Sequence, residues 1–398
     1  MLTTAKELKR SALVFPSTYT HRTVPLLRLL IILILLLHHC DGTVHQHGAA
    51  FAEEVACWLR AESLFVTPFN VPWLPRSALM VGRAGLQPCM ALHLLPTPQS
   101  PAEVLSSSAN VDASDEWETR NVAGPPLVHL WQDEWMEKSD IVRSRLLAMT
   151  GKSERIMARK TFVRRINAAT LENFLQENHL WGPTQARFRY GLFRKRGIPS
   201  LDLGAVGCQH ESHEAMEHLV AVASFSPRRH VDRCGVRFRS HELIRYCSKR
   251  GTSVVGGISK LMAAFEREME PDDVITVVDR NWGAGDGWGS LGFKALQKMP
   301  PATFYIGPDG KRCHAMGTGR NPYRRQIPVE LMTEFRSRAN DVSSMEELSQ
   351  FLADQGFYRV HDAGARRLVL LRRELPDSNA FANSSPKYPS EYYLSNPL

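Results

Sequence analysis

The most restrictive feature of this chain is a succession of short apolar runs separated by glycine turns. The runs with the length and composition of buried strands cover residues 187–194, 218–226, 242–247, 274–278 and 303–306. Between two of them, Gly256-Gly257 opens a segment that places Leu261, Met262 and Phe265 on one helix face. Strand, glycine turn, helix and strand in this order predict an α/β (α+β) fold, with a mixed, splayed sheet flanked by helices.

Further elements extend the folded part to about residues 127–373. Residues 127–131 and 161–166 read as strands, 137–149 and the segment from Asn167 as helices, the latter with Thr170 as N-cap, and 195–217 as a long loop. Residues 331–335 and 345–352 are amphipathic, and Ser344 and Glu347 form a capping-box pattern.

The two ends of the chain differ from this middle part. Residues 1–45 are basic, and 24–40 are mostly apolar, which is typical of a targeting or signal-anchor segment and predicts a mitochondrial or membrane location with a single anchor. Residues 46–126 are rich in Pro, Ser and Ala, and we expect a low-order linker with one short helix around 53–64. Residues 374–398 read as a flexible tail.

Charge is distributed unevenly. Residues 1–126 hold nine basic and ten acidic side chains, so 127–398 hold 40 basic and 31 acidic ones, a net charge of +9 within a total of +8. Such a surplus favours either a polyanion partner or an ordinary basic surface. The basic residues that we select as nucleic-acid contacts are Arg159, Lys160, Arg187, Arg189, Arg228, Arg229, Arg280, Arg324 and Arg325. For Arg280, organisation of the following loop is an equal alternative.

Metal binding is not predicted. The seven cysteines include no CxxC pair, which argues against a disulfide framework or a closed zinc site and favours a reducing compartment. Cys208, His210, His213, Glu214 and His218 lie close in sequence, but we interpret them as a polar surface insertion rather than a zinc site.

Two segments resemble the acyl-CoA half of the GNAT N-acetyltransferase fold. They are residues 254–261 (VVGGISKL), between two strands, and residues 288–293 (WGSLGF). The resemblance implies acetyl-CoA as a ligand, with its pyrophosphate at a helix N-terminus. The contacts implied are the backbone groups of Val255, Gly256, Gly257, Ile258 and Ser259.

A narrower resemblance covers most of residues 127–373. Blocks in the order typical of phage-type homing endonucleases occur at 131–135, 141–144, 158–160, 178–182, 243–247, 253–257, 279–285, 291–293 and 356–364. In that group a nuclease domain similar to very-short-patch-repair endonucleases precedes a GNAT-like domain. The resemblance implies that 127–160 is a nuclease remnant, a strand plus a helix, and that 161–373 is the GNAT-like domain with a C-terminal extension.

The chain departs from both families at the chemistry. Residues 41–126 lack the spaced carboxylates that would hold Mg²⁺, so we expect nuclease activity to be lost. In the glycine turn, Val254 stands where the acetyltransferases usually have Arg or Gln. The catalytic candidates that remain are Glu242, His179 and Trp288, although an indole cannot act as a general acid and a structural histidine at a helix end is the favoured interpretation of His179.

Two hypotheses follow from these patterns. The first is a DNA- or RNA-binding protein with a GNAT-like domain, derived from a homing-endonuclease-type ancestor. The second is an N-acyltransferase that uses acetyl-CoA. A structural subunit of an organellar ribonucleoprotein is a third, and no stable protein partner can be inferred.

Overall fold

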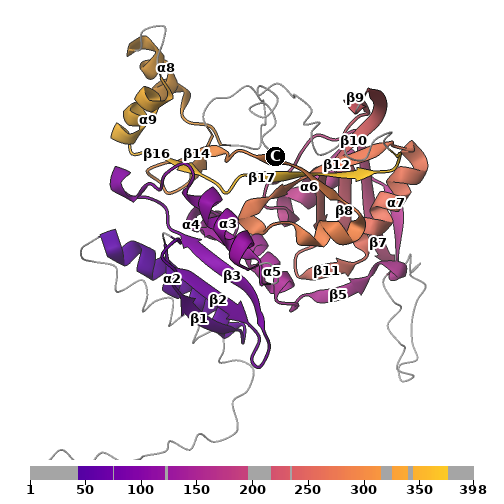
Figure 1. The fold of residues 1–398 in the computed structure, drawn as a ribbon, viewed down its shortest axis with the longest axis horizontal. Helices are drawn as coiled ribbons and strands as arrows, with labels where there is room; N and C mark the ends of the chain where they lie inside the picture. The colour runs from indigo at the N-terminus through magenta and orange to yellow at the C-terminus, as the bar shows by residue number, and fades with distance from the viewer. Residues whose placement is uncertain are drawn as a thin grey trace, which may run out of the picture. The chain divides into compact units, whose positions relative to one another are not determined.

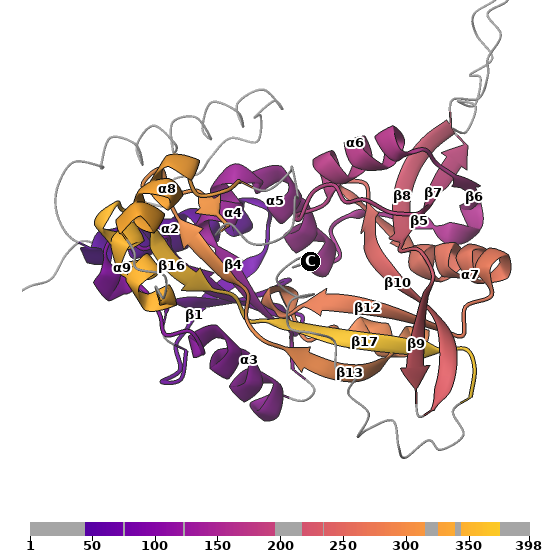
Figure 2. The ribbon, with the colours of Figure 1, turned by 90° about the horizontal axis from the view of Figure 1, so that it is seen from above.

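A four-stranded sheet and an eight-stranded sheet organise the protein (Figures 1 and 2). The computed structural model describes residues 44–374 except Pro75, 122–123, 196–216, Cys234, 315–324 and 339–343. The fold of these residues is mixed α/β, as the sequence predicts. The apolar run at 24–40, residues 208–214 of the predicted polar insertion, Arg324 and the tail fall outside the described residues, whereas His218 lies on the strand Glu217–Phe225.

The four-stranded sheet begins the described chain. Its strands, in hydrogen-bonded order, are β1 (Phe65–Phe69), β2 (Ala78–Gly82), β3 (Pro88–Leu95) and β4 (Leu127–Trp131). The first three are antiparallel, and β4 runs parallel to β3. Helix α2 (Val44–Ala61) packs its Phe51, Val55 and Leu59 on one face, and α3 (Ala109–Arg120) packs Ala113 and Trp117 on the other.

The prediction of a low-order linker at 46–126 is therefore wrong, apart from its helix. The prediction failed because prolines were taken as evidence against strands. Pro68 lies on β1 at the sheet edge and Pro88 is the first residue of β3, and at both positions a strand tolerates the missing N–H. None of the four strands of this sheet carries an Asp or Glu residue.

The eight-stranded sheet has the order β13-β17-β12-β10-β8-β7-β6, with β9 paired to β10. Its strands are β6 (Thr161–Arg165), β7 (Phe188–Lys195), β8 (Glu217–Phe225), β9 (Arg229–Arg233), β10 (Val236–Ser248), β12 (Asp273–Asp279), β13 (Lys294–Met299) and β17 (Ala365–Leu371). Helix α7 (Gly257–Met269) packs against Ala223 and Phe225 of β8, while α6 (Ala168–Asn178) packs against Val222. Successive strand residues point to opposite faces, so the two helices cover opposite faces.

Smaller elements complete the fold. They are α4 (Gln132–Glu137), α5 (Ser139–Met149), α8 (Val329–Arg338), α9 (Met345–Asp354), the parallel pair β5 (Glu154–Met157) and β11 (Thr252–Val255), the sheet β15-β14-β16 (Arg312–Cys313, Thr303–Ile306, Tyr358–His361), and the 3₁₀ turns η1 (Pro101–Glu103), η2 (Ala158–Lys160), η3 (Arg280–Trp282) and η4 (Asp286–Leu291). Residues 303–306 thus do not complete the main sheet, since β13 and β17 do.

Two helix caps test the local predictions. The capping box at Ser344 and Glu347 is confirmed, with both side chains bonded to the reciprocal backbone N–H groups. The N-cap of α6 is Asn167 rather than Thr170, because the Asn167 side chain accepts from the Thr170 N–H. Within residues 44–374, gaps aside, no helix has the length and apolarity to cross a membrane.

Ion pairs near the end of β12 connect the eight-stranded sheet to α3, the helix that packs on the four-stranded sheet. The described residues from His47 onward belong to one compact unit. Arg280 in η3 is 2% exposed and forms ion pairs with Asp115 and Glu118 of α3. Arg366 of β17 pairs with Glu118 and Lys298 of β13 with Asp115. Arg280 is thus a structural residue, and its prediction as a nucleic-acid contact is wrong.

Replacing Arg280 is therefore expected to damage stability. Arg280→Met should lower the free energy of unfolding by about 3 kcal/mol, the lower end of the cost of breaking a buried ion pair, because both carboxylates keep another partner. Urea denaturation followed by circular dichroism measures it. Arg325→Met, which removes the exposed pair with Asp309, should cost less than about 1 kcal/mol. Equal effects of the two substitutions would contradict a structural role for Arg280.

Candidate functional site

The two central strands of the large sheet separate part of the way along their length. Strands β10 and β12 pair in parallel from Ser240↔Asp273 to Leu243↔Thr276. Beyond this point β10 pairs with β8, after a bulge between Leu243 and Arg245, and β12 pairs with β17. The splayed pair expected from the GNAT resemblance is present.

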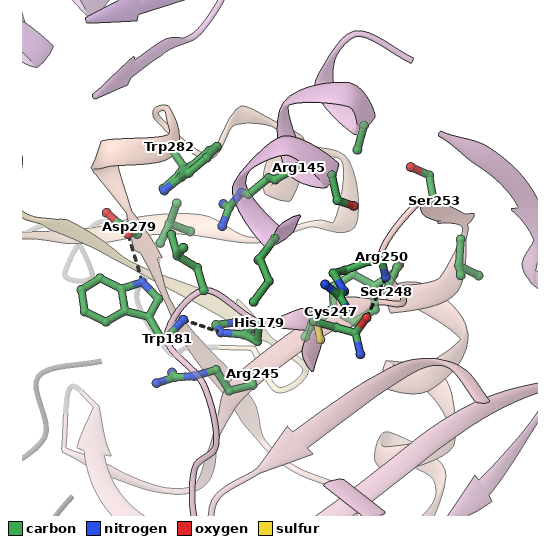
Figure 3. A pocket seen from close by; sticks show the side chains of 18 of the residues that line it. Arg145, His179, Trp181, Arg245, Cys247, Ser248, Arg250, Ser253, Asp279 and Trp282 are labelled. Atoms are coloured by element: carbon green, nitrogen blue, oxygen red, sulfur yellow. Dashed lines mark hydrogen bonds between the residues drawn. The ribbon is translucent and has the colours of Figure 1, made fainter. Parts of the chain in front are cut away.

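A cleft of about 520 Å³ lies where the strands separate (Figure 3). Its walls come from residues 243–248 of β10, 276–279 of β12, α5, the segment after α6, and residues 282–288. The charged residues lining it are Arg145, Arg245, Lys249, Arg250 and Asp279. Arg250 pairs with Asp140 outside the lining, but Arg145, Arg245 and Lys249 form no ion pair with a described residue, so the cleft is suited to an anionic ligand.

Arg145 reaches the cleft from α5. Its guanidinium stacks over the Trp282 ring, 4.3 Å from the centroid, and forms no ion pair with any residue that the structure describes. Burial lowers the pKa of Arg145, although Asp279 and Glu134 nearby oppose the shift. The guanidinium stays charged, since the pKa of arginine lies far above neutral pH.

Arg245 enters the same cleft from β10. It is 7% exposed, its Nη1 donates to the carbonyl of the adjacent Ile244 at 2.9 Å, and its Nε is buried without a partner. Burial lowers the pKa of Arg245 to about 10. In the described chain it has no ion pair, and the nearby Glu242 and Asp279 offset the cost of burying its charge only in part.

A hydrogen-bonded chain lines the cleft between the two arginines. The Trp181 backbone N–H donates to Nδ1 of His179 at 3.1 Å, and the Trp181 indole N–H donates to Oδ2 of Asp279 at 3.1 Å. With Nδ1 accepting, the neutral His179 carries its proton on Nε2. Burial and then the neighbouring Arg245 and Arg145 keep the pKa of His179 well below its usual value.

Val254, at the start of the glycine turn, lines this cleft, but the ligand contacts predicted in that turn do not. Of the predicted contacts Val255, Gly256, Gly257, Ile258 and Ser259, none lines it. The Tyr246 hydroxyl instead lies at the start of α7, bonded to the Ile258 backbone. A Cβ at Gly257 would meet that oxygen at 2.8 Å. A pyrophosphate therefore has less room at the start of α7 than the resemblance implies.

The three catalytic candidates differ in whether they line the cleft. His179 and Trp288 line the cleft, but Glu242 does not. His179 is a hydrogen-bond donor rather than a base, given its tautomer. Asp279 is the cleft carboxylate, its Oδ1 accepting from the Asn281 N–H at 2.9 Å, and burial raises its pKa.

The predicted nucleic-acid residues form two groups rather than one patch. Exposed Arg159 and Lys160 precede β6, beside the Arg194 end of β7, because Thr161 pairs with Arg194. Arg187, Arg189, Arg228 and Arg229 lie at the other end of β7 or follow β8. Arg325 is paired with Asp309.

The sequence analysis did not predict that Arg145 and Arg245 line the cleft, or that Asp279 is its carboxylate. Arg245 alternates with apolar residues on a strand, and Arg145 sits on an ordinary amphipathic helix. One signal was available, a charged residue inside the buried run 242–247. Neither protein-family models nor curated proteins nor solved structures match this chain.

Removing the charge of Arg245 should not harm the fold. Arg245→Met is expected to leave the free energy of unfolding unchanged or raise it by up to about 2 kcal/mol, because a buried charge that is only partly compensated is lost. Arg233→Met is the matched control, since the buried Arg233 pairs with Asp273, and it should cost about 3 kcal/mol or more. Urea denaturation compares them. A larger loss for Arg245→Met than for Arg233→Met would contradict this partial compensation.

Proposed function

We propose that the cleft between β10 and β12 binds an organic phosphate of the acyl-CoA class. The observation that supports it is the pair of arginines, Arg145 and Arg245, that lie in the cleft without an ion-pair partner among the described residues. Anions bind such guanidinium groups through charge-assisted, bidentate hydrogen bonds. The phosphates would lie on the arginines rather than on the start of α7, where Tyr246 stands.

The cleft also holds a group that could take up a proton during acyl transfer. An amine that attacks a thioester carbonyl must lose a proton, and a positioned carboxylate can accept it. Asp279, with its pKa raised by burial, is better placed for this role than Glu242. The Nε2–H of His179 can donate to an acyl oxygen. N-acyl transfer is thus the reaction that this set of side chains would best support.

Calorimetric titration of acetyl-CoA into the full chain tests the binding. Wild type should bind, and Arg245→Met should weaken binding roughly tenfold to hundredfold, the value of a hydrogen bond to a charged group of about 1.5–3 kcal/mol. Ser259→Glu is the matched variant, because Ser259 is exposed in the first turn of α7 and a carboxylate there suits the helix dipole. It should bind as wild type does.

Two outcomes would overturn this proposal. Absence of heat with wild type at millimolar acetyl-CoA would remove the ligand class. Loss of binding in Ser259→Glu, with Arg245→Met unchanged, would move the phosphates to the helix N-terminus and away from the arginines.

Nucleic-acid binding is the second candidate, and one surface favours it. Among the described strands, β9 pairs with β10 alone and forms a two-stranded ribbon with the first half of β10. Arg228 and Arg237 are exposed there and make no ion pair with a described residue, whereas Arg239 pairs with Asp272. Partial desolvation and then the nearby Arg237 and Arg228 lower the pKa of His230, while Asp272 opposes the shift. Such a ribbon can follow a phosphate backbone.

Fluorescence anisotropy with a 20-nucleotide single-stranded RNA tests the ribbon. Arg228→Ala with Arg237→Ala should weaken binding and reduce the slope of log affinity against log salt by about 1.4, two phosphate contacts' worth. Arg325→Ala, which changes an exposed but paired arginine, should bind as wild type does. An unchanged slope in the double variant, or no binding by wild type at about 50 mM salt, would exclude the ribbon as the contact surface.

A further inference from the structure

A serine and two histidines form a hydrogen-bonded chain between α3 and the four-stranded sheet. Ser114 Oγ lies 2.8 Å from His129 Nε2, and His129 Nδ1 lies 2.8 Å from His93 Nδ1. Both histidines are 0% exposed and Ser114 is 5% exposed. His93 and His129 are direct partners in the parallel register of β3 and β4. Strand pairing and helix packing therefore fix the three side chains.

The hydrogen-bond partners set the direction of the protons. Among the described residues, His129 Nε2 is the one acceptor for the Ser114 hydroxyl, so the serine donates and His129 carries its proton on Nδ1. That proton is donated to His93 Nδ1, which leaves the Nε2–H of His93 buried without a partner. The reverse order would leave both the serine proton and His93 Nε2 unpaired.

Both imidazoles are neutral at pH 7. Burial lowers the pKa of His93 to about 3, and burial followed by the charge of its neighbours keeps the pKa of His129 well below its usual value. The Nε2 lone pair of neutral His129 accepts the serine hydroxyl and can take up its proton, although burial makes this imidazole a weaker base than an exposed histidine.

Ser114 also lines a cavity of about 230 Å³. The cavity follows one face of α3 through Ser114, Trp117, Glu118 and Asn121, at helical spacing. It exceeds the roughly 30 Å³ that one water occupies in the liquid. Arg280 lines it too, and its Nε is buried without a partner. A hydrogen-bond donor is thus available on a residue that lines the same cavity as the serine.

We infer that Ser114 is the nucleophile of a second site that hydrolyses small carboxylic esters. Nucleophile, base and orienting group at these distances are the signature of an activated serine. The Ser114 oxygen forms a bond to the acyl carbon, the ester C–O bond breaks, and the serine proton passes through His129 Nε2 to the leaving alcohol. Water then attacks the acyl-serine with His129 again taking and returning a proton, which releases the acid and restores the serine. The Arg280 Nε–H is the donor for the carbonyl oxygen as it gains charge.

A fluorophosphonate probe on the folded full chain tests this inference. The expected result is one adduct per chain, located on Ser114 by peptide mass spectrometry, with none in Ser114→Ala. Ser107→Ala, at an exposed turn before α3, should be labelled as wild type is. Hydrolysis of p-nitrophenyl acetate should fall in Ser114→Ala and in His129→Gln by roughly a hundredfold or more. Wild type that leaves Ser114 unmodified at saturating probe would overturn the inference.

Ser114→Cys keeps the test decisive if the other variants unfold. It changes one atom, so the fold is expected to persist. A thiol bonded to His129 should react with iodoacetamide at least as fast as the partly buried Cys57, whose pKa is raised by burial and Glu53. If the introduced thiol reacts no faster than that of the fully buried Cys313, the serine is a packed core residue and the inference fails.

Discussion

The separation of β10 from β12 after Leu243 and Thr276 is the constraint on which the cleft depends. Each strand is held away from the other by its outer neighbour, β8 for β10 and β17 for β12. The inner edges consequently lose their mutual hydrogen bonds, and buried backbone groups need other partners. The Thr276 hydroxyl donates to the Leu243 carbonyl at the fork, and Arg245 donates to the Ile244 carbonyl beyond it.

This use of side chains explains how the cleft can hold cations. Arg245 satisfies an edge carbonyl while it keeps most of its donors free, and Arg145 rests on the Trp282 ring instead of on a carboxylate. A cation over an aromatic face is stabilised by about 0.5–2 kcal/mol. This is less than the attraction to a carboxylate would supply in the same surroundings. A bound anion would supply the missing compensation, so ligand binding and stability of this region are coupled.

The sequence pattern predicts the central strands of the eight-stranded sheet well and the strands of the four-stranded sheet poorly. Strand runs such as 218–226 and 274–278 are continuous and apolar because both their faces are covered, by α6 and α7 in the case of β8. Strand β1 has the pattern FVTPF and lies at an edge, so neither burial nor periodicity marks it. Strands β5 and β11, like β13 and β17, are far apart in the sequence, so no local pattern predicts that they pair.

The sequence predicts the splayed sheet and its glycine turn, but not the side chains that line the cleft. Glycines at 256–257 locate the turn after the splayed strand, and Gly256 does adopt a positive φ of 75°. What the local pattern could not reveal is that Tyr246, ten residues earlier, reaches the start of α7, or that Arg145 arrives from a helix a hundred residues upstream. Side chains that converge from distant segments are set by the tertiary fold alone.

A comparison of the two faces of the four-stranded sheet shows that the buried hydrogen-bonded chain of Ser114, His129 and His93 calls for an explanation. The α2 face is apolar throughout, with Phe51, Leu92 and Leu130 in one cluster. The α3 face places two histidines opposite each other and leaves His93 Nε2 unpaired, a cost of about 1–3 kcal/mol for a buried donor. Apolar side chains of similar size would pack there without that cost. A polar chain that is expensive for folding, and that ends on a cavity rather than in the core, is better explained by chemistry at Ser114 than by stability.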